Sequence, residues 1–136
     1  MKVLQISTVC GSGSVGRITV DIYHTLKSCG DEGLIAYGRR QAPEGVEAFR
    51  FGSDLDMGFH VLSSFFRGEH GFASTGQTRK LIEKIREWDP DVIHLHNIHG
   101  FILQVEELFS YLKQADKPVV WTLHDCWPYT GHCAFY

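Results

Sequence analysis

The sequence predicts an α/β fold with an open, mostly parallel sheet and helices on both faces of the sheet. Short apolar runs rich in β-branched residues alternate along the chain with longer segments of helical periodicity. Each apolar run is followed by polar or glycine-rich residues. Because crossovers between parallel strands are right-handed, the carboxyl ends of the strands meet at one edge of the sheet. We therefore expect the segments that follow the strands to gather at that edge, where open α/β sheets bind their ligands.

The first half of the chain opens with a strand and a glycine- and serine-rich loop that leads into a helix. Apolar residues in this helix recur at spacings of four, four and three, which predicts a single buried face. That face consists of Ile18, Ile22, Leu26 and Cys29. The other elements expected here are strands at Lys2–Ser7, Gly33–Tyr37 and Val46–Phe51 and a helix at Asp54–Phe66.

The second half repeats the alternation of helix and strand. A helix begins at Ser74 or Thr75 and ends at Trp88, where Asp89-Pro90 stops it. A strand at Asp91–His96 and a helix at Phe101–Lys113 follow. Helical spacing predicts one inward face for each of the two helices. These faces consist of Leu81, Ile82, Ile85 and Trp88 in the first helix and of Phe101, Val105, Leu108, Phe109 and Leu112 in the second. The last strand begins behind Pro118 and runs to Leu123, and its apolar, β-branched sequence predicts a buried, central strand.

Length and composition indicate one globular domain over residues 1–136. The chain has 136 residues, a formal net charge of −3, and 43% hydrophobic residues, which suffice for a core of its own. No basic stripe suggests nucleic acid as a partner, and no apolar run reaches the roughly 20 residues of a membrane span. The start MKVLQIS lacks the apolar region of a signal peptide, so we expect a cytoplasmic location. The last residues read as unfinished, and we expect the domain to be truncated.

The loop after the first strand offers one candidate phosphate site. Gly11, Gly13 and Gly16 match the pattern G-x-G-x-x-G between a strand and a helix, where backbone N–H groups can bind phosphate. The alternative is that these glycines only allow a flexible turn. Arg17, at the start of the helix, adds a cation that an anionic ligand could use.

Two details argue against a dinucleotide site in this loop. The first glycine comes several residues after the apolar strand, so the turn is too long. The second strand ends in Tyr37-Gly38-Arg39-Arg40, without an acidic residue to bind a ribose diol. Arg39 or Arg40 could instead bind a 2′-phosphate, which keeps an NADP-dependent oxidoreductase as an alternative.

Histidines crowd the end of the fourth strand. His94 and His96 point to the same side of that strand, and His99 lies in the loop beyond it. Three histidines would suit zinc, but the same residues suit a hydrogen-bonded wall or a histidine in the core. We expect no metal here.

The last strand delivers a titratable pair, His124 and Asp125, at its carboxyl end. Such a pair suits a site in an open α/β sheet, although the two side chains could also only bond each other and cap the loop. Six residues separate Cys126 from Cys133, more than in a zinc knuckle, so a metal site shared with downstream residues stays open.

Three stretches of this sequence together resemble the N-terminal domain of bacterial family-4 retaining glycosyltransferases of the GT-B fold. These stretches are MKVLQIST with GSGSVGRI, DVIHLHNIHG, and PVVWTLHDCWPYTGHC, and the resemblance is to enzymes of colanic-acid-type polysaccharide biosynthesis. In that family two Rossmann-like domains face each other across a cleft. The resemblance implies that the N-terminal domain mainly binds the acceptor and a C-terminal domain, absent here, binds the nucleotide sugar.

The resemblance also implies roles for individual residues. His124 would face the reacting centre, with Asp125 fixing it as the second catalytic residue. The implied substrate-binding residues are Gly13, Ser14, Gly16, Arg17, Asn97, His99, Trp127 and Tyr129. The donor would be a UDP- or GDP-hexose, and the domain itself would hold no cofactor.

The implied partners are a saccharide or lipid-linked acceptor, the nucleotide sugar and the missing C-terminal domain, with peripheral membrane contact of the whole enzyme. We expect the chain alone to be inactive and to self-associate, in part through Phe59, Phe65 and Phe66. A non-catalytic module that binds a nucleotide or a saccharide is the alternative outside the enzymes.

Overall fold

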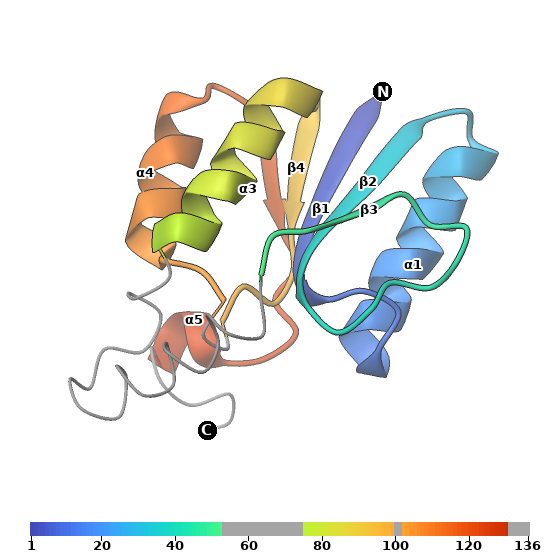
Figure 1. The fold of residues 1–136 in the computed structure, drawn as a ribbon, viewed down its shortest axis with the longest axis horizontal. Helices are drawn as coiled ribbons and strands as arrows, with labels where there is room; N and C mark the ends of the chain where they lie inside the picture. Colours follow the sequence, from blue (N-terminus) through green and yellow to red (C-terminus); the bar gives the residue numbers. More distant parts are fainter. Residues whose placement is uncertain (53–74, 100–101, 131–136) are drawn as a thin grey trace.

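The computed structural model describes residues 1–52, 75–99 and 102–130, and its strands form a five-stranded parallel sheet (Figure 1). The strand order is β3-β2-β1-β4-β5, and every neighbouring pair is parallel. The strands are β1 (Lys2–Val9), β2 (Glu32–Arg39), β3 (Ala48–Arg50), β4 (Val92–Leu95) and β5 (Val119–Trp121). The predicted open α/β sheet is confirmed.

Helices cover both faces of this sheet. The helix α1 (Gly13–Ser28) packs on one face against β1 and β2, and α3 (Thr75–Trp88) and α4 (Val105–Gln114) lie together on the other (Figure 1). The short helix α5 (Trp127–Thr130) lies beyond the carboxyl ends of the strands. The helix predicted at Asp54–Phe66 lies outside the described residues.

Alternate residues of the strands serve the two faces, as expected for a pleated sheet. Leu4 and Ile6 of β1 point into a large apolar core between the sheet and the helices α3 and α4. Gln5, between them, points to the α1 side and is also fully buried. The helix residues in this core are Leu81, Ile85, Leu108 and Leu112. The inward faces predicted for these two helices are therefore confirmed at the described positions.

The buried face predicted for α1 is wrong at Ile18 and Cys29, while Ile22 and Leu26 are half-buried. Ile18 is 39% exposed and Cys29 is exposed, whereas the buried residues are Gly16, Thr19 and Tyr23. Gly16 lets the helix approach the first loop so closely that a β-carbon there would lie 3.0 Å from the Gly11 nitrogen. The side of the helix that faces the sheet is the one that carries Gly16, Thr19 and Tyr23.

The prediction that the last strand is buried and central is also wrong. The strand β5 lies at the edge of the described sheet, and its residues Val119 and Val120 are 41% and 50% exposed. Trp121 alone in this strand packs on the core, with its ring 5.4 Å from that of Phe109. The apolar sequence of this edge strand offers a surface that could pair with another segment.

None of the described helices is long and apolar enough to cross a membrane.

The close approach of α1 can be tested with a pair of glycine variants. We expect Gly16→Ala to lower the free energy of unfolding by about 1–3 kcal/mol, because the new methyl group would lie 3.0 Å from the Gly11 nitrogen and the loop backbone must shift to admit it. Gly76→Ala, near the start of α3, is the matched control, since nothing lies within 4 Å of its β-carbon. It should stabilise the chain by about 0.4–1 kcal/mol. Urea unfolding of the two variants measures both effects, and a gain in stability for Gly16→Ala would contradict the tight packing.

Candidate functional site at the carboxyl edge of the sheet

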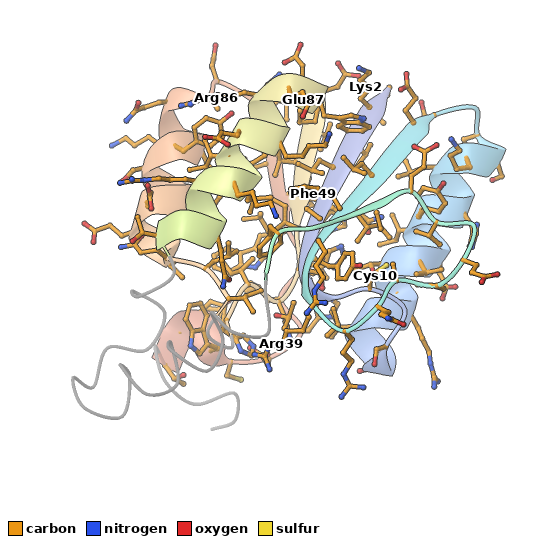
Figure 2. All side chains as sticks on the ribbon, viewed as in Figure 1. Lys2, Cys10, Arg39, Phe49, Arg86 and Glu87 are labelled. Carbon is orange, nitrogen blue, oxygen red and sulfur yellow. The ribbon has the colours of Figure 1, made fainter. Side chains whose placement is uncertain are left out.

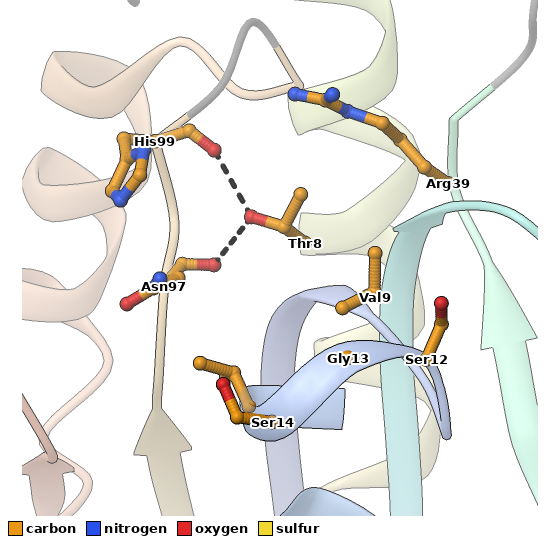
Figure 3. Close-up of a pocket in the computed structure, with 9 residues that line it drawn as sticks. Thr8, Val9, Ser12, Gly13, Ser14, Arg39, Asn97 and His99 are labelled. Atoms are coloured by element: carbon orange, nitrogen blue, oxygen red, sulfur yellow. Dashed lines mark hydrogen bonds between the residues drawn. The ribbon is translucent and has the colours of Figure 1, made fainter. Parts of the chain in front are cut away.

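The carboxyl edge of the sheet brings together the segments that follow β1, β2, β4 and β5. Figure 2 shows Lys2 at the amino end of the sheet and Arg39 at the opposite end. A pocket of about 370 Å³ opens at this edge, beside the first turn of α1 (Figure 3). Its lining residues are Thr8, Val9, Ser12, Gly13, Ser14, Val15, Arg39, Asn97 and His99.

Thr8 joins the two central strands at the pocket. Its hydroxyl shares its single proton between the carbonyl oxygens of Asn97, at 2.8 Å, and His99, at 3.0 Å (Figure 3). Its backbone N–H also donates to the Asn97 carbonyl, at 2.8 Å. The segment after β4 is therefore held against the end of β1.

The glycine loop forms the floor of the pocket. Gly11 and Gly13 have φ of 70° and 68°, in the left-handed region that favours glycine. A β-carbon at Gly11 would lie 2.7 Å from Pro43 Cγ, so this position also needs a glycine for space. Gly13 and Ser14 line the pocket as expected, whereas Gly16 is buried under the loop and Arg17 is exposed outside the lining.

The cation of the pocket comes from β2 rather than from α1. Arg39 lines the pocket, and the neighbouring Arg40 donates to the hydroxyl of Ser12 at 2.8 Å. Burial, and then the charge of Arg40, lower the pKa of Arg39, but a guanidinium remains charged in proteins. The pocket therefore combines a positive charge, the first turn of a helix and several hydroxyl groups.

Asp125 is bonded to His99 instead of the expected His124. His99 Nε2 lies 2.7 Å from Asp125 Oδ2, and the backbone N–H of Trp127 donates to Oδ1 at 3.0 Å. Burial raises the pKa of Asp125, but the hydrogen bonds from His99, Trp127 and Asn97 outweigh it and hold the pKa below its ordinary value. Asp125 thus connects the loop after β5 to two residues of the pocket wall.

His124 is bonded to His96. The distance from His124 Nε2 to His96 Nδ1 is 3.0 Å, and the two rings are stacked. His96 Nε2 lies 3.1 Å from Gln5 Oε1, and Gln5 Nε2 donates to the carbonyl of Thr19 at 3.0 Å. His124 therefore stands at the end of a chain of hydrogen bonds that crosses the sheet.

His96 is buried and His94 half-buried, and burial favours the neutral form of both rings. Burial, followed by the nearby His94 and His124, lowers the pKa of His96 to about 3. Burial and then His124 also lower the pKa of His94, which lies 2.8 Å from the Thr122 hydroxyl. The described residues contain no group of three or more side chains placed to hold a metal ion.

The remaining candidates lie around the pocket without lining it. The Trp127 ring lies 5.3 Å from the His99 ring, and Tyr129 is 78% exposed. Cys126 is a free thiol, and Cys133 lies outside the described residues. Burial raises the pKa of Cys10 to about 11, so this thiol stays protonated at neutral pH.

The sequence analysis did not predict the pocket residues Thr8 and Ser12 or the buried Gln5 as part of the site. Gln5 carries a signal that could have found it, because a glutamine inside an otherwise apolar strand is rarely buried without a specific partner. Thr8 and Ser12 carry no such signal, since hydroxyl residues are ordinary in loops.

An open parallel sheet with a pocket beside its first strand–helix turn defines a Rossmann-like α/β domain. A family model described as Glycosyltransferase Family 4 matches residues 15–136, which is nearly the whole chain. The chain belongs to this glycosyltransferase family, as its sequence motifs led us to expect.

One curated relative is named as a colanic acid biosynthesis glycosyl transferase, WcaC, of Escherichia coli (strain K12). This chain is 37% identical to it over 51 residues, which make up 34% of the chain and 13% of that protein. The chain thus matches only a small part of the relative's length.

The buried His96 predicts a specific dependence of stability on pH. Its pKa is about 3 in the folded state and about 6.5 when exposed, so below pH 6.5 the unfolded state binds a proton that the folded state does not. Stability from this residue is therefore complete above pH 6.5. It is lost at up to about 1.4 kcal/mol per pH unit as the pH falls toward 3.

We expect His96→Leu to flatten this loss, which urea unfolding at several pH values between 7 and 4 would measure. His24→Leu, at an exposed position of α1, is the control and should keep the slope of the unmodified chain. Equal slopes for His96→Leu and the unmodified chain would show that His96 titrates normally.

Proposed function

We propose that this chain is the acceptor-binding, N-terminal half of a retaining glycosyltransferase of the GT-B fold. The proposed reaction moves a hexose from UDP- or GDP-hexose to a saccharide or lipid-linked acceptor in polysaccharide biosynthesis. One observation carries the proposal: a chain of Glycosyltransferase Family 4 has its pocket at the carboxyl edge, beside the first turn of α1. The name of the relative WcaC supports polysaccharide biosynthesis as the process.

The chemistry of the pocket suits a sugar nucleotide. The first turn of α1 has free backbone N–H groups, and Ser12 at its N-cap makes no side-chain cap bond. Together with Arg39 these groups favour the oxygens of a diphosphate, whose charge grows as the leaving group departs. Ser14 and Asn97 offer hydrogen bonds to sugar hydroxyls. Arg17 is proposed to act from outside the pocket, as a cation near an anionic ligand.

The histidines and the loop after β5 are proposed to form the wall that faces the sugar. His124 would contact the reacting centre, and Asp125 would act through His99, which it holds at 2.7 Å. Trp127, packed beside His99, and the exposed Tyr129 would contact the acceptor. The work of this half is positioning and electrostatic support, and it needs no nucleophile of its own.

The donor sugar is proposed to bind mainly to a second domain that faces this pocket across a cleft. Since the reaction consumes a nucleotide sugar, we propose the cytoplasm as its location. Contact with the membrane surface would follow from a lipid-linked acceptor. The exposed apolar edge at β5 and the loop beyond it, Val119, Val120 and Leu123, is proposed to mediate self-association of the chain when it is alone.

The first test is transfer itself. A protein that joins this chain to its donor-binding domain should release nucleoside diphosphate from UDP- or GDP-hexose when an acceptor is present. The product should keep the anomeric configuration of the donor, which proton NMR of the glycoside reports. The chain alone should show no turnover above a buffer control, because the donor sugar is proposed to bind mainly to the second domain.

Other outcomes of this test identify the alternatives. An inverted anomer would contradict the retaining reaction. Tight binding of a nucleotide or saccharide without transfer, by the joined protein, would indicate a binding module. Micromolar binding of NADP in calorimetry would indicate an oxidoreductase, with Arg39 and Arg40 as the residues that hold the 2′-phosphate.

The second test concerns His124. In the joined protein, we expect His124→Ala to lower kcat by on the order of 10²-fold, the usual effect of losing a positioned donor or acid–base group. The melting temperature should fall only modestly, because His124 is half-buried outside the apolar core and its loss removes one hydrogen bond, that to His96. His24→Ala, on the outer surface of α1, is the control and should leave both values unchanged. A large drop in melting temperature with normal kcat would make His124 a structural residue.

A further inference from the structure

A row of polar side chains crosses the interior of the sheet on its α1 side. Gln5 of β1 is 0% exposed and His96, after β4, is 1% exposed, although the centre of a parallel sheet is normally apolar. The row begins at the carbonyl of Thr19 in α1 and ends at the half-buried ring of His124. Burying these groups is costly unless each finds a partner, and each of them does.

The chemistry of the first partner sets the direction of every hydrogen bond in the row. A carbonyl oxygen can only accept, so the end of Gln5 that lies 3.0 Å from Thr19 must be its amide nitrogen. The amide oxygen of Gln5 then faces His96 Nε2 at 3.1 Å, and this nitrogen must carry the proton. The reverse arrangement would place two acceptor oxygens next to each other.

The same reasoning continues from His96 to His124. Burial keeps His96 neutral at physiological pH, so a proton on its Nε2 leaves its Nδ1 as an acceptor. His124 Nε2, 3.0 Å from that acceptor, must therefore donate. The other ring nitrogen of His124, Nδ1, has no hydrogen-bond partner among the described residues.

We propose that the row Thr19–Gln5–His96 fixes His124 as a single tautomer, with the proton on Nε2 and the lone pair on Nδ1. Gln5 and His96 are positioning residues that act through His124. The lone pair on Nδ1 suits one kind of ligand group, a hydroxyl that donates a hydrogen bond to it. The role of this lone pair in sugar transfer rests on the function proposed above, whereas the tautomer itself does not.

Nitrogen-15 NMR of the histidine rings in the 136-residue chain tests the tautomer directly. At pH 8.5, well above the ordinary imidazole pKa of about 6.5, the coupling pattern of each neutral ring reports which nitrogen carries the proton. We expect His124 to be protonated on Nε2 alone and His96 on Nε2 alone. A mixture of tautomers, or a proton on Nδ1 of His124, would overturn the proposal without any variant.

Two substitutions of His96 separate the effect of losing its Nδ1 acceptor from the effect of losing its ring. His96→Leu removes the acceptor, and His124 should become a mixture of tautomers. His96→Asn places an amide oxygen near the position of Nδ1, and His124 should keep most of its Nε2 proton. Gln5→Leu should also release the tautomer, because nothing then sets the proton of His96.

His94→Gln is the matched control for these variants. It replaces a histidine on the same face that bonds to Thr122 and stands outside the row. It should leave the tautomer of His124 unchanged. If His96→Leu or Gln5→Leu also leaves His124 fully protonated on Nε2, the row does not set the tautomer and the proposal is wrong.

Turnover in the joined protein tests the role in transfer separately. Gln5→Leu and His96→Leu should lower kcat by on the order of 10-fold, as the loss of an orienting partner does, with KM little changed. His96→Asn should recover part of the loss. If His124 becomes a mixture of tautomers in these variants while kcat stays normal, the role in transfer is contradicted, but the proposal that the row sets the tautomer stands. Loss of activity in His124→Ala tests the proposed function on its own.

Discussion

The hydrogen bonds of Thr8 are the constraint on which the carboxyl edge depends. Its backbone N–H and its hydroxyl hold the carbonyls of Asn97 and His99, so the segment after β4 cannot move away from the end of β1. This places the His99 ring where Asp125 reaches it at 2.7 Å. Asp125 in turn fixes the first residues of the loop after β5 through the N–H of Trp127. Three strands thus share one connected edge.

The polar row beneath this edge has the opposite character to the apolar core on the other face. The core around Leu4 and Ile6 gains stability simply by excluding water, and many apolar side chains would serve there. Gln5 and His96 gain stability only while each hydrogen bond is made, because an unpaired polar group in the interior costs about 1–3 kcal/mol. A polar row in a place that apolar residues could fill is typical of a site rather than of a core.

The pocket and the close packing of α1 have a common cause in the glycine loop. Gly11 and Gly13 take positive φ, which folds the loop back over the start of the helix. Gly16 allows the helix to lie under that loop without a clash. Gly11 and Gly16, which do not line the pocket, therefore help to bring the first turn of α1 to it, while Arg39 reaches the same pocket from the neighbouring strand.

The local sequence alone determined which of the described segments form the strands and the three longer helices, whereas the observed ends differ from the predicted ones by a few residues and the short α5 was not predicted. Periodicity marks Leu81, Ile82 and Ile85 as the buried side of α3, and the alternation of strands and helices predicts a parallel sheet with a single functional edge. The family motifs point to the same edge. These features are encoded by residues close together in the chain, so local pattern and turn chemistry suffice to predict them.

Only the tertiary structure decided which side of α1 is buried, that β5 is exposed at an edge, and which side chains bond one another. Gly16 of α1 is buried against Gly11 and Val9 while Ile18 is exposed, and strand order puts Val120 in the edge strand of the described sheet. The partners of Asp125 and His124 lie 26 and 28 residues away, and Gln5 meets His96 across 91 residues. Such pairs depend on register and distance in space, which no spacing along the sequence specifies.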